Sequence, residues 1–491
     1  MTSTDLSPKA APVLLTGWGR GSASAAHLIH IESQDELSRH VATAAATGGP
    51  LLARGLGRSY GDAAQCAGGT VLDCTAIDRL VAADFETGVV RVEAGCSLMS
   101  LLRLVVPKGW FLPVTPGTAH VSLGGAVAAD VHGKNHHRDG AFGNFVDALM
   151  LVTPTGPVEA GPAKDEDVFW ATLGGMGLTG AVTEVGLRLR PIETSSMLVD
   201  TERAFDLDDA MAKLSDADAQ HGYSVAWIDG LARGRRLGRG VVAGADHACR
   251  SDLLGSSRRM RSLRRMRSPA VEARHIRIGL TPPSNILKPA LVAAFNEMWF
   301  RKAPLHRQGE LQKISSFFYP LDALADWNRL YGRRGFTQYQ FVVPFGAERV
   351  VHAALEQMHS CGLVPTLCVL KRFGASDPAP LSFPAPGWTL AVDLPLGTGE
   401  LRQGLDRVDE LVAGANGRVY LAKDGRLRPD LLSVMYPRLD EWLATRDRLD
   451  PQGVFRSDLW RRLYRRREGL TKRWRTVHRP VEPNISVIEG A

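Results

Sequence analysis

Three glycine-rich loops within the first two hundred residues constrain this chain more than any other feature of its sequence. They lie in the segments LLARGLGRSYGD (51–62), PGTAHVSLGGAVAADVHGKNHH (116–137) and FWATLGGMGLTGAVTEVGLRL (169–189). Glycine reaches positive φ angles and lets successive backbone N–H groups point at one spot, so such loops can cradle an anion such as a pyrophosphate. Any one of these loops could be a simple tight turn. Three in one region predict a site where the backbone closely approaches a flat, charged ligand.

The first loop has the features of a phosphate cradle without a standard fingerprint. Gly55, Gly57 and Gly61 lie within seven residues, but the segment lacks the G-K-[ST] ending of a Walker loop and the G-x-G-x-x-G spacing of dinucleotide-binding folds. The second loop leads through small residues to His132 and Lys134, whose side chains can supply hydrogen-bond donors at the polar edge of a ligand. The loops therefore indicate a ligand with phosphates and a ring.

The pattern of apolar residues predicts the fold class. Apolar runs of a few residues alternate with Gly, Pro and Asp through about the first 195 residues, which is typical of strands. Helical spacing occurs between them, for example in SLMSLLRLVVPKG (97–109) and DEDVFWATLGG (165–175). From residue 196 on, longer amphipathic segments alternate with strand-like pieces. The sequence predicts a two-domain α+β protein, whose second domain is an antiparallel sheet covered by helices.

We expect four segments along the chain. The first domain would span 1–195 and the second 196–412, with a basic insertion near 250–269. Residues 413–463 would return to the first domain and cap the cofactor and active site, and 464–491 would form a flexible basic tail. The chain has 491 residues, of which 44% are hydrophobic, so it is long and apolar enough for at least two packed units.

The sequence predicts neither a membrane span nor a signal peptide. The long uncharged stretch 109–129 contains prolines and glycines, and the apolar run between Lys9 and Arg20 is too short for a secretory signal. We therefore expect a soluble chain, cytoplasmic or peripheral at the cell membrane. Six cysteines are scattered without metal-ligand spacing, so we expect buried, reduced thiols and no metal site.

The formal charge of +7 is concentrated in two short segments. Residues 250–267 carry a net charge of +6 and residues 456–479 a net charge of +8, so the rest of the chain is mildly acidic. Such runs can bind nucleic acid, bind an anionic membrane surface, or be only a solvated face. Nucleic-acid motifs and interleaved aromatic residues do not accompany them, so we expect no nucleic-acid partner. Peripheral contact with an anionic membrane surface is the functional alternative to a solvated face.

In order and spacing, the three loops resemble the FAD-binding domain of flavoproteins of the vanillyl-alcohol oxidase and p-cresol methylhydroxylase type. In that superfamily the first loop frequently reads G-G-H-S, and its histidine can attach covalently to the flavin. This chain has Arg58 at that place. The resemblance thus implies that FAD is the cofactor and that it is bound without a tether at this position.

Eight sequence blocks resemble the decaprenylphosphoryl-β-D-ribose 2'-oxidase family, the flavin subunits of the epimerase for cell-wall arabinose. The blocks are TGWGR (16–20), ARGLGRSYGD, HGKNHH, FWATLGGMGLTG, FYPLDALADWNRLYG, QYQFVVP, APLSFPAPGW and LAKDG (421–425). They imply FAD-dependent oxidation of the 2'-hydroxyl of a polyprenylphosphoryl-β-D-ribose to a keto sugar, the first half of epimerisation to the arabinose donor. They also imply a partner, a separate NAD(P)H-dependent keto-reductase.

The same resemblance implies the residues of the site. For FAD it implies Ala53, Arg54, Gly55, Leu56, Gly57, Arg58, Ser59, Tyr60, Gly61, Asp62, Ala63, Gly117, Ser122, Leu123, Gly124, Gly125, Ala129, Asp130, Val131, His132, Val182 and Tyr420. For the substrate it implies Tyr60, Gln338, Gln340, Lys371, Thr389 and Ala391. Two residues compete equally for the role of general base. Lys423 can accept a proton if burial lowers its pKa, and it can offset charge on the reduced flavin. His132 has an unperturbed pKa closer to neutrality.

Two positions in WTLAVDLPL (388–396) depart from the family pattern. Ala391 stands where the mycobacterial-type sequence has a cysteine facing the flavin, and Thr389 stands where it has an asparagine. Hydride chemistry does not need the thiol, but agents that modify this thiol should lose their target. Threonine cannot reproduce the donor and acceptor pair of an amide. Oxidation of another sugar or polyol, for example in specialised metabolism, and a flavin-free binding protein with the same fold therefore stay open.

Overall fold

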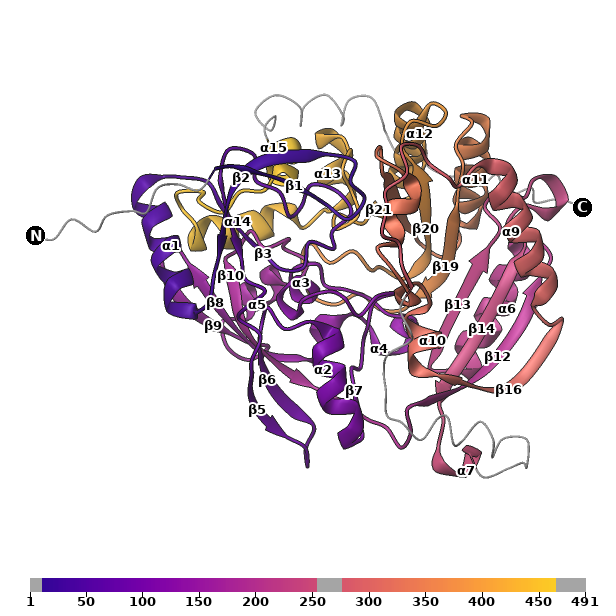
Figure 1. The fold of residues 1–491 in the computed structure, drawn as a ribbon, viewed down its shortest axis with the longest axis horizontal. Coiled ribbons are helices and arrows are strands. Elements are labelled where there is room, and N and C mark those ends of the chain that lie inside the picture. Colours follow the sequence, from indigo (N-terminus) through magenta and orange to yellow (C-terminus); the bar gives the residue numbers. More distant parts are fainter. Residues whose placement is uncertain (1–10, 254–275, 465–491) are drawn as a thin grey trace, which may run out of the picture.

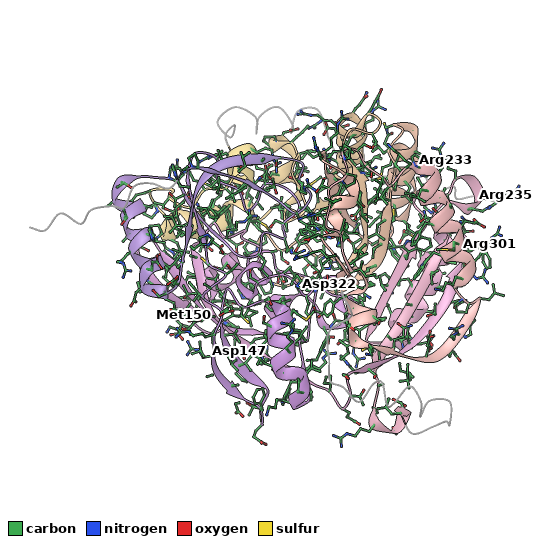
Figure 2. All side chains as sticks on the ribbon, in the orientation of Figure 1. Asp147, Met150, Arg233, Arg235, Arg301 and Asp322 are labelled. Atoms are coloured by element: carbon green, nitrogen blue, oxygen red, sulfur yellow. The ribbon has the colours of Figure 1, made fainter. Side chains whose placement is uncertain are left out.

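A computed structural model describes residues 11–253 and 276–464, which form two groups of elements around separate sheets (Figure 1). The N-terminal elements, drawn in indigo and purple, lie beside the C-terminal helices, drawn in yellow. The middle of the chain, in magenta to orange, forms the other group. The chain thus leaves the first group and later returns to it. Asp322 lies near the middle of the molecule, where the two groups meet (Figure 2).

A four-stranded sheet opens the first group. Its strands, in spatial order, are β1(Val13–Thr16), β2(Ala23–His30), β4(Thr70–Asp73) and β3(Leu51–Arg54). Strands β2 and β3 both run parallel to β4, so α1(Gln34–Thr47) is the crossover that parallel strands need. Ser33 caps this helix by accepting a hydrogen bond from the N–H of Glu36, and Gly48 ends it with a φ of +71°. Strand β3 then runs directly into the first glycine loop.

A five-stranded antiparallel sheet completes the first group. Its strands, in spatial order, are β5(Leu80–Asp84), β6(Val89–Glu93), β10(Ala181–Arg188), β8(Val146–Thr153) and β9(Gly156–Ala160). Buried residues alternate along these strands, for example Leu149 and Leu151 in β8 and Val185 and Leu187 in β10. The core of this group also takes in the helices α2(Leu98–Val105), α3(Leu123–Ala128) and α5(Glu166–Thr172).

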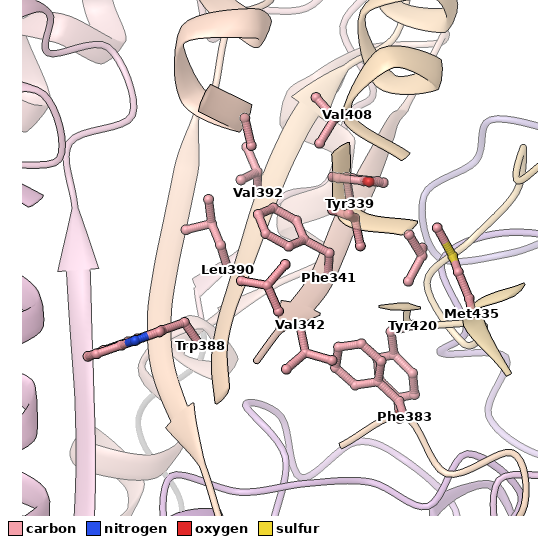
Figure 3. Close-up of a cluster of buried hydrophobic side chains, with 14 of the residues drawn as sticks. Tyr339, Phe341, Val342, Phe383, Trp388, Leu390, Val392, Val408, Tyr420 and Met435 are labelled. Carbon is pink, nitrogen blue, oxygen red and sulfur yellow. The ribbon is translucent and has the colours of Figure 1, made fainter. Parts of the chain in front are cut away.

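An eight-stranded antiparallel sheet organises the second group. Its strands, in spatial order, are β16(His306–Lys313), β12(Ser196–Ala204), β14(Gly240–His247), β13(Tyr223–Ile228), β19(Leu367–Phe373), β20(Gly387–Pro395), β18(Phe336–Val343) and β21(Arg418–Val419). One face is covered by α6(Leu207–Gln220), α9(Pro289–Lys302), α11(Glu348–Ser360) and α12(Leu401–Gly414) (Figure 1). Tyr339 and Phe341 pack with Leu390, Val392 and Val408 in the core of this group (Figure 3).

Shorter elements connect these layers. They are β7(Trp110–Phe111), α4(His136–Asp139), β11(Arg190–Pro191), α7(Arg250–Leu253), β15(Ile276–Arg277), α10(Ile314–Phe318), β17(Leu324–Ala325), α13(Pro429–Met435), α14(Leu439–Leu449) and α15(Asp458–Tyr464). The C-terminal segment is anchored to the first group. Leu51 forms a parallel bridge with Phe455, and the carboxylate of Asp458 accepts a hydrogen bond of 2.8 Å from the N–H of Ala67.

The predicted α+β class, with a second sheet that is antiparallel and covered by helices, is confirmed. The segment boundaries stay a prediction. Strand β21 falls within the segment 413–463 but pairs with β18 of the large sheet. Most of the predicted basic insertion and nearly all of the predicted basic tail lie outside the described residues.

Two further expectations concern cysteines and membrane spans. Five of the six cysteines are buried, but Cys249 is exposed, so the expectation of a buried thiol was wrong for this residue, which directly precedes α7. Across residues 11–253 and 276–464, no helix has both the length and the apolar character needed to cross a bilayer.

Candidate active site

A large cavity lies between the glycine loops and the face of the eight-stranded sheet that is opposite the helices. It contains about 1930 Å³ of space free of protein atoms, counted together with the solvent at its mouth. One wall is formed by the loop after β3, the start of α3 and the third glycine loop. The other wall is formed by β18, β19 and β20 and by residues 420–423 after β21.

The first loop presents an uninterrupted row of backbone donors. Within the described part of the chain, the five N–H groups from Gly55 to Ser59 donate to no acceptor, whereas the N–H of Tyr60 donates to the carbonyl of Ala422 at 3.1 Å. Gly57 has a φ of +63°, and a Cβ at Gly55 would lie 2.0 Å from Ser122 Oγ. The loop therefore needs glycine at these positions, and its free N–H groups form the kind of nest that binds a pyrophosphate.

The second and third loops leave open space on the same wall. Ser122 caps α3 by accepting a hydrogen bond of 3.3 Å from the N–H of Gly125. Next to it, Gly124 packs against Ala94, where an added Cβ would lie 3.0 Å away. Gly117 and Gly177 have no other atom within 4 Å of where a Cβ would lie. This wall therefore combines close backbone packing with room for a ring system, and the residues present fit FAD.

The register of three strands sets the opposite wall. Gln338, Asp393 and Leu367 are aligned across β18, β20 and β19, and Gln340, Ala391 and Val369 form the next row. Side chains two residues apart share a face of a sheet, so these rows, unlike the core residues between them, point to the cavity side. All six except Asp393 line the cavity. A shift of one residue would bury the polar set in the apolar core.

His132 is held on both of its ring nitrogens. Its Nδ1 lies 3.0 Å from Nζ of Lys371, and its Nε2 lies 3.1 Å from the side-chain nitrogen of Gln340. Gln340 also donates to the hydroxyl of Thr389 at 2.9 Å. Whichever ring nitrogen carries the proton, no lone pair is left for a substrate hydroxyl. Burial, followed by the positive charge of Lys371 and then Lys423, places the pKa of His132 well below its usual value.

Lys423 lies above the aromatic rings at the junction of the two walls. Its Nζ is 5.7 Å from the ring centre of Tyr60 and 5.8 Å from that of Tyr420. Burial lowers the pKa of Lys423 to about 8, and the negative charge of Asp393 opposes this effect. Asp393 is fully buried and accepts hydrogen bonds from Gln338 and Tyr331. A lysine with such a pKa can exchange a proton near neutral pH.

The structure brings most of the predicted residues to this one cavity. Those that line it are Ala53, Arg54, Gly55, Leu56, Gly57, Arg58, Ser59, Tyr60, Ala63, Gly117, Ser122, Gly124, Gly125, Ala129, Val131, His132, Val182, Gln338, Gln340, Lys371, Ala391, Tyr420 and Lys423. Their roles toward cofactor and substrate stay predictions. Their positions are consistent with the roles implied by the family resemblance.

Five predicted residues do not line the cavity: Gly61, Asp62, Leu123, Asp130 and Thr389. Each makes a contact within the protein, and its role toward the cofactor or substrate stays a prediction. A Cβ on Gly61 would lie 1.9 Å from the carbonyl of Asp424, and Asp62 is paired with the guanidinium of Arg462 at 2.9 Å. Leu123 is a core residue, and Asp130 accepts a hydrogen bond from Ser382. Thr389 reaches the cavity only through Gln340. Runs of neighbouring residues include such supporting positions, which a sequence pattern does not separate.

Several residues of the cavity were missed. Trp18 and Trp327 line it and lie edge to face with ring centres 6.0 Å apart, and the guanidinium of Arg58 stacks 3.8 Å from the ring centre of Trp18. Asp322 also lines it and accepts a hydrogen bond from the N–H of Ala119. These residues lie within TGWGR and FYPLDALADWNRLYG, so those blocks were the available signal. No cluster of His, Cys, Asp or Glu in the described ranges could hold a metal ion.

Comparisons with known proteins agree with this geometry. Residues 25–160 match the FAD binding domain family, and residues 400–463 match the D-arabinono-1,4-lactone oxidase family. The chain is 39% identical over 455 residues to a decaprenylphosphoryl-beta-D-ribose oxidase of Mycolicibacterium smegmatis, a match that covers 91% of this chain and 97% of the relative. It is 42% identical over 371 residues to an uncharacterized protein of Streptomyces coelicolor, covering 75% of this chain and 99% of the relative.

A more distant relative is an L-gulono-1,4-lactone dehydrogenase of Mycobacterium tuberculosis, 29% identical over 167 residues, which are 34% of this chain and 38% of the relative. The similarity to the mycolicibacterial oxidase spans both walls of the cavity, whereas this shorter match covers about a third of each chain. The chain therefore belongs to the decaprenylphosphoryl-β-D-ribose oxidase family of FAD-dependent oxidoreductases.

Proposed function

We propose that this protein oxidises the 2'-hydroxyl of a polyprenylphosphoryl-β-D-ribose to the 2'-keto sugar. The observation that carries the proposal is the cavity, because one of its walls offers free backbone N–H groups and the other offers amines and amides, beside the imidazole of His132. The name of the mycolicibacterial relative supports the choice of substrate. This step would be the first half of an epimerisation that leads to an arabinose donor for cell-wall synthesis.

The glycine-loop wall would hold the cofactor. The N–H groups from Gly55 to Ser59 would bind the pyrophosphate, since these donors have no acceptor among the described residues. FAD, when bound, supplies the acceptor for the hydride that leaves the sugar carbon. Arg58, whose guanidinium stacks on Trp18, stands where related flavoproteins carry a linking histidine. We therefore propose that the cofactor is bound non-covalently, and that acid precipitation releases all of it into the supernatant.

Lys423 would be the general base, because it faces the cavity and its pKa lies near 8. It would take the proton of the hydroxyl as the carbon loses its hydride. His132 would instead be a positioning residue, since Lys371 and Gln340 occupy its two nitrogens. It would orient Gln340 and Lys371, which reach the cavity from β18 and β19. Lys371 can donate to a sugar hydroxyl, and the side-chain oxygen of Gln340, which has no partner among the described residues, can accept from one.

The proposal extends to partners. The product is a ketone, so completion of the epimerisation requires a separate reductase that delivers hydride from NAD(P)H to the opposite face of the sugar carbon. The substrate carries a lipid phosphate, and we propose that the protein works peripherally at an anionic membrane surface.

The test is anaerobic reduction of the purified holoenzyme, followed at the flavin absorption band. A short-chain prenylphosphoryl ribose should bleach the flavin, and ribose 5-phosphate, free ribose and xylitol at the same concentration should not. Bleaching by a soluble polyol or lactone alone would contradict the proposal. Protein that stays colourless after incubation with FAD would contradict every redox function and favour a binding protein.

A second function, the oxidation of another sugar or polyol, is supported by two observations. Ala391 and Thr389 depart from the family pattern on or next to the cavity wall, and residues 400–463 match a sugar-lactone oxidase family. Oxidation of another sugar or polyol would use the same cofactor wall with a different substrate wall. The same anaerobic assay separates the two functions, because its soluble substrates lack the prenyl phosphate.

A further inference from the structure

Helix α9(Pro289–Lys302) carries an exposed apolar face. The residues that it buries are Val292, Asn296 and Phe300. Beside this stripe, Leu291, Phe295, Met298 and Trp299 are between 42% and 55% exposed. Their spacing places them on one face of the helix, and the rings of Phe295 and Trp299 stack at 6.1 Å. Contiguous exposed apolar side chains of this size are typical of an interaction surface.

This apolar face is not what attaches α9 to the protein. The amide of Asn296 donates to Asp229 at 2.7 Å, and Arg239 bridges Asp229 and Glu297. Phe300 packs under Arg239, whose guanidinium lies 4.9 Å from its ring centre. The helix is thus fixed to the large sheet by its buried stripe and by this ion-pair network. The exposed face takes no part in this attachment among the residues that the structure describes.

Six cationic side chains come from the ends of α9 and from the turn that precedes β14. Three come from the turn Gly234–Arg236 and its preceding residue, and three come from the ends of the helix: Arg233, Arg235, Arg236, Lys288, Arg301 and Lys302. Figure 2 shows Arg233, Arg235 and Arg301 at the same edge of the molecule. Glu297 is the one carboxylate of the helix, and it is shared by Arg239 and Arg301. The surface therefore combines an apolar stripe with a strong excess of positive charge.

The segment before α9 links this surface to the cavity. Residues Ile276 and Leu280 are 69% and 86% exposed, and Ile276 pairs with Leu324, which lies on the chain between the cavity-lining residues Asp322 and Trp327. Further along, the N–H of Ile286 donates to the carbonyl of Leu330. Exposed apolar side chains thus occur along the segment that connects the rim of the cavity to α9.

We propose that α9 and these six cationic side chains, the α9 surface, dock the protein on an anionic lipid bilayer. Leu, Phe, Met and Trp on one helix face can enter the headgroup region, and the flanking Lys and Arg side chains can pair with anionic headgroups. The exposed apolar side chains on the segment between this surface and the cavity suit a substrate that stays anchored in the bilayer. This inference locates the membrane contact of the proposed function, but vesicle binding needs no catalysis and is tested separately from it.

The first test is vesicle flotation with the full chain. Wild-type protein should bind phosphatidylcholine vesicles with 30% phosphatidylglycerol at least about tenfold more strongly than pure phosphatidylcholine vesicles. The triple variant Leu291→Ser/Phe295→Ser/Trp299→Ser should lose about tenfold in binding to the anionic vesicles. The matched control Val81→Ser/Leu104→Ser changes apolar side chains of similar exposure, 48% and 49%, on β5 and α2, and it should bind like wild type.

The second test locates the contact independently of affinity. Vesicles with brominated acyl chains should quench the fluorescence contributed by Trp299, measured as the difference between wild type and Trp299→Phe. Equal binding of wild type and triple variant, or no quenching of Trp299, would overturn the proposal. A dimer in solution that the triple variant loses, without any change in vesicle binding, would assign the α9 surface to a second copy and would also overturn it. Turnover of a short-chain, water-dispersed substrate should be the same in all these variants.

Discussion

The two walls of the cavity present different chemical groups. The loop wall offers backbone N–H groups and glycines, and its donors from Gly55 to Ser59 carry no titratable group except Arg58. The wall of strands and the adjoining residues 420–423 offer Lys371 and Lys423, whose pKa values are lowered by burial. His132, from the second glycine loop, lies between Lys371 and Gln340, and burial lowers its pKa as well. The first wall therefore recognises a ligand by shape and fixed dipoles, and the second can exchange protons with it.

This difference predicts that the two walls respond to different kinds of substitution. On the loop wall, an added methyl group should matter more than a change of charge. On the strand wall, a change of functional group should matter more than a change of volume. The predictions below test this comparison in order of decreasing effect, and one of them uses Lys134, a lysine outside both walls whose pKa is also lowered by burial, as a reference for Lys423.

Lys423→Met should lower the rate of flavin reduction by about 100- to 10,000-fold, the usual range for loss of a general base. FAD should still bind, because the N–H donors of the loop wall are unchanged. Stopped-flow absorbance gives the rate, and the ratio of flavin to protein absorbance gives the occupancy. A rate within tenfold of wild type would exclude Lys423 as the base, and His132→Gln would then be the variant to examine.

Gly61→Ala should destabilise the protein by about 1–3 kcal/mol and weaken FAD binding, because the added Cβ would lie 1.9 Å from the carbonyl of Asp424. This contact joins the first loop to the segment that carries Lys423. Gly279→Ala is the matched control, since nothing lies within 4 Å of its Cβ position and it does not line the cavity. Thermal unfolding and flavin titration measure both effects. Equal stability of the two variants would show that the backbone of the first loop shifts to accommodate the added methyl group.

Lys134→Met tests how much the burial of a charged lysine lowers the stability of the fold, at a position outside the cavity. Burial lowers the pKa of Lys134 to about 7 from 10.5, and this side chain does not line the cavity. Below pH 7 the amine is charged in both the folded and the unfolded chain, so its burial penalty is fully present. Between about pH 7 and 10.5 only the unfolded chain holds the proton, so wild-type stability rises with pH.

Lys134→Met should consequently unfold at higher denaturant concentration than wild type at pH 6, and this advantage should shrink as the pH rises toward 10. The hydrogen bond from Lys134 to the carbonyl of Phe317 and its contact with the Phe317 ring are lost at every pH, so the slope of the difference is the informative quantity. An advantage that is independent of pH would contradict the assigned pKa.

Ala391→Cys should have the smallest effect on activity, about twofold or less, because a thiol is a small side chain and proton transfer does not use it. It should, however, make the cavity reactive toward a thiol-specific reagent, which intact-protein mass spectrometry would detect. Cys249→Ser is needed as the background, since Cys249 is exposed and the other five cysteines are buried. Labelling of the cavity in the parent protein would show that another cysteine, such as the cavity-lining Cys74, is reachable.

Much of the fold follows from local sequence. Capping by Ser33 and Gly48 defines α1, and alternating apolar residues define β8 and β10. Other features depend on contacts between distant segments. Asp393 reads as one more residue of a strand, and only its hydrogen bonds with Gln338 and Tyr331 show that it supports the site. Trp18 and Trp327 meet across more than three hundred residues of chain.

By itself, the sequence determined that the backbone would form an anion and ring cradle, because the freedom of glycine to adopt positive φ and to pack closely is a property of the residue type. Only the tertiary structure decided which polar groups face that cradle. The register of β18, β19 and β20 selects Gln338, Gln340 and Lys371, and long-range packing leaves His132 without a free nitrogen. Strand register and burial are set by contacts between residues far apart in the chain, which no local pattern encodes.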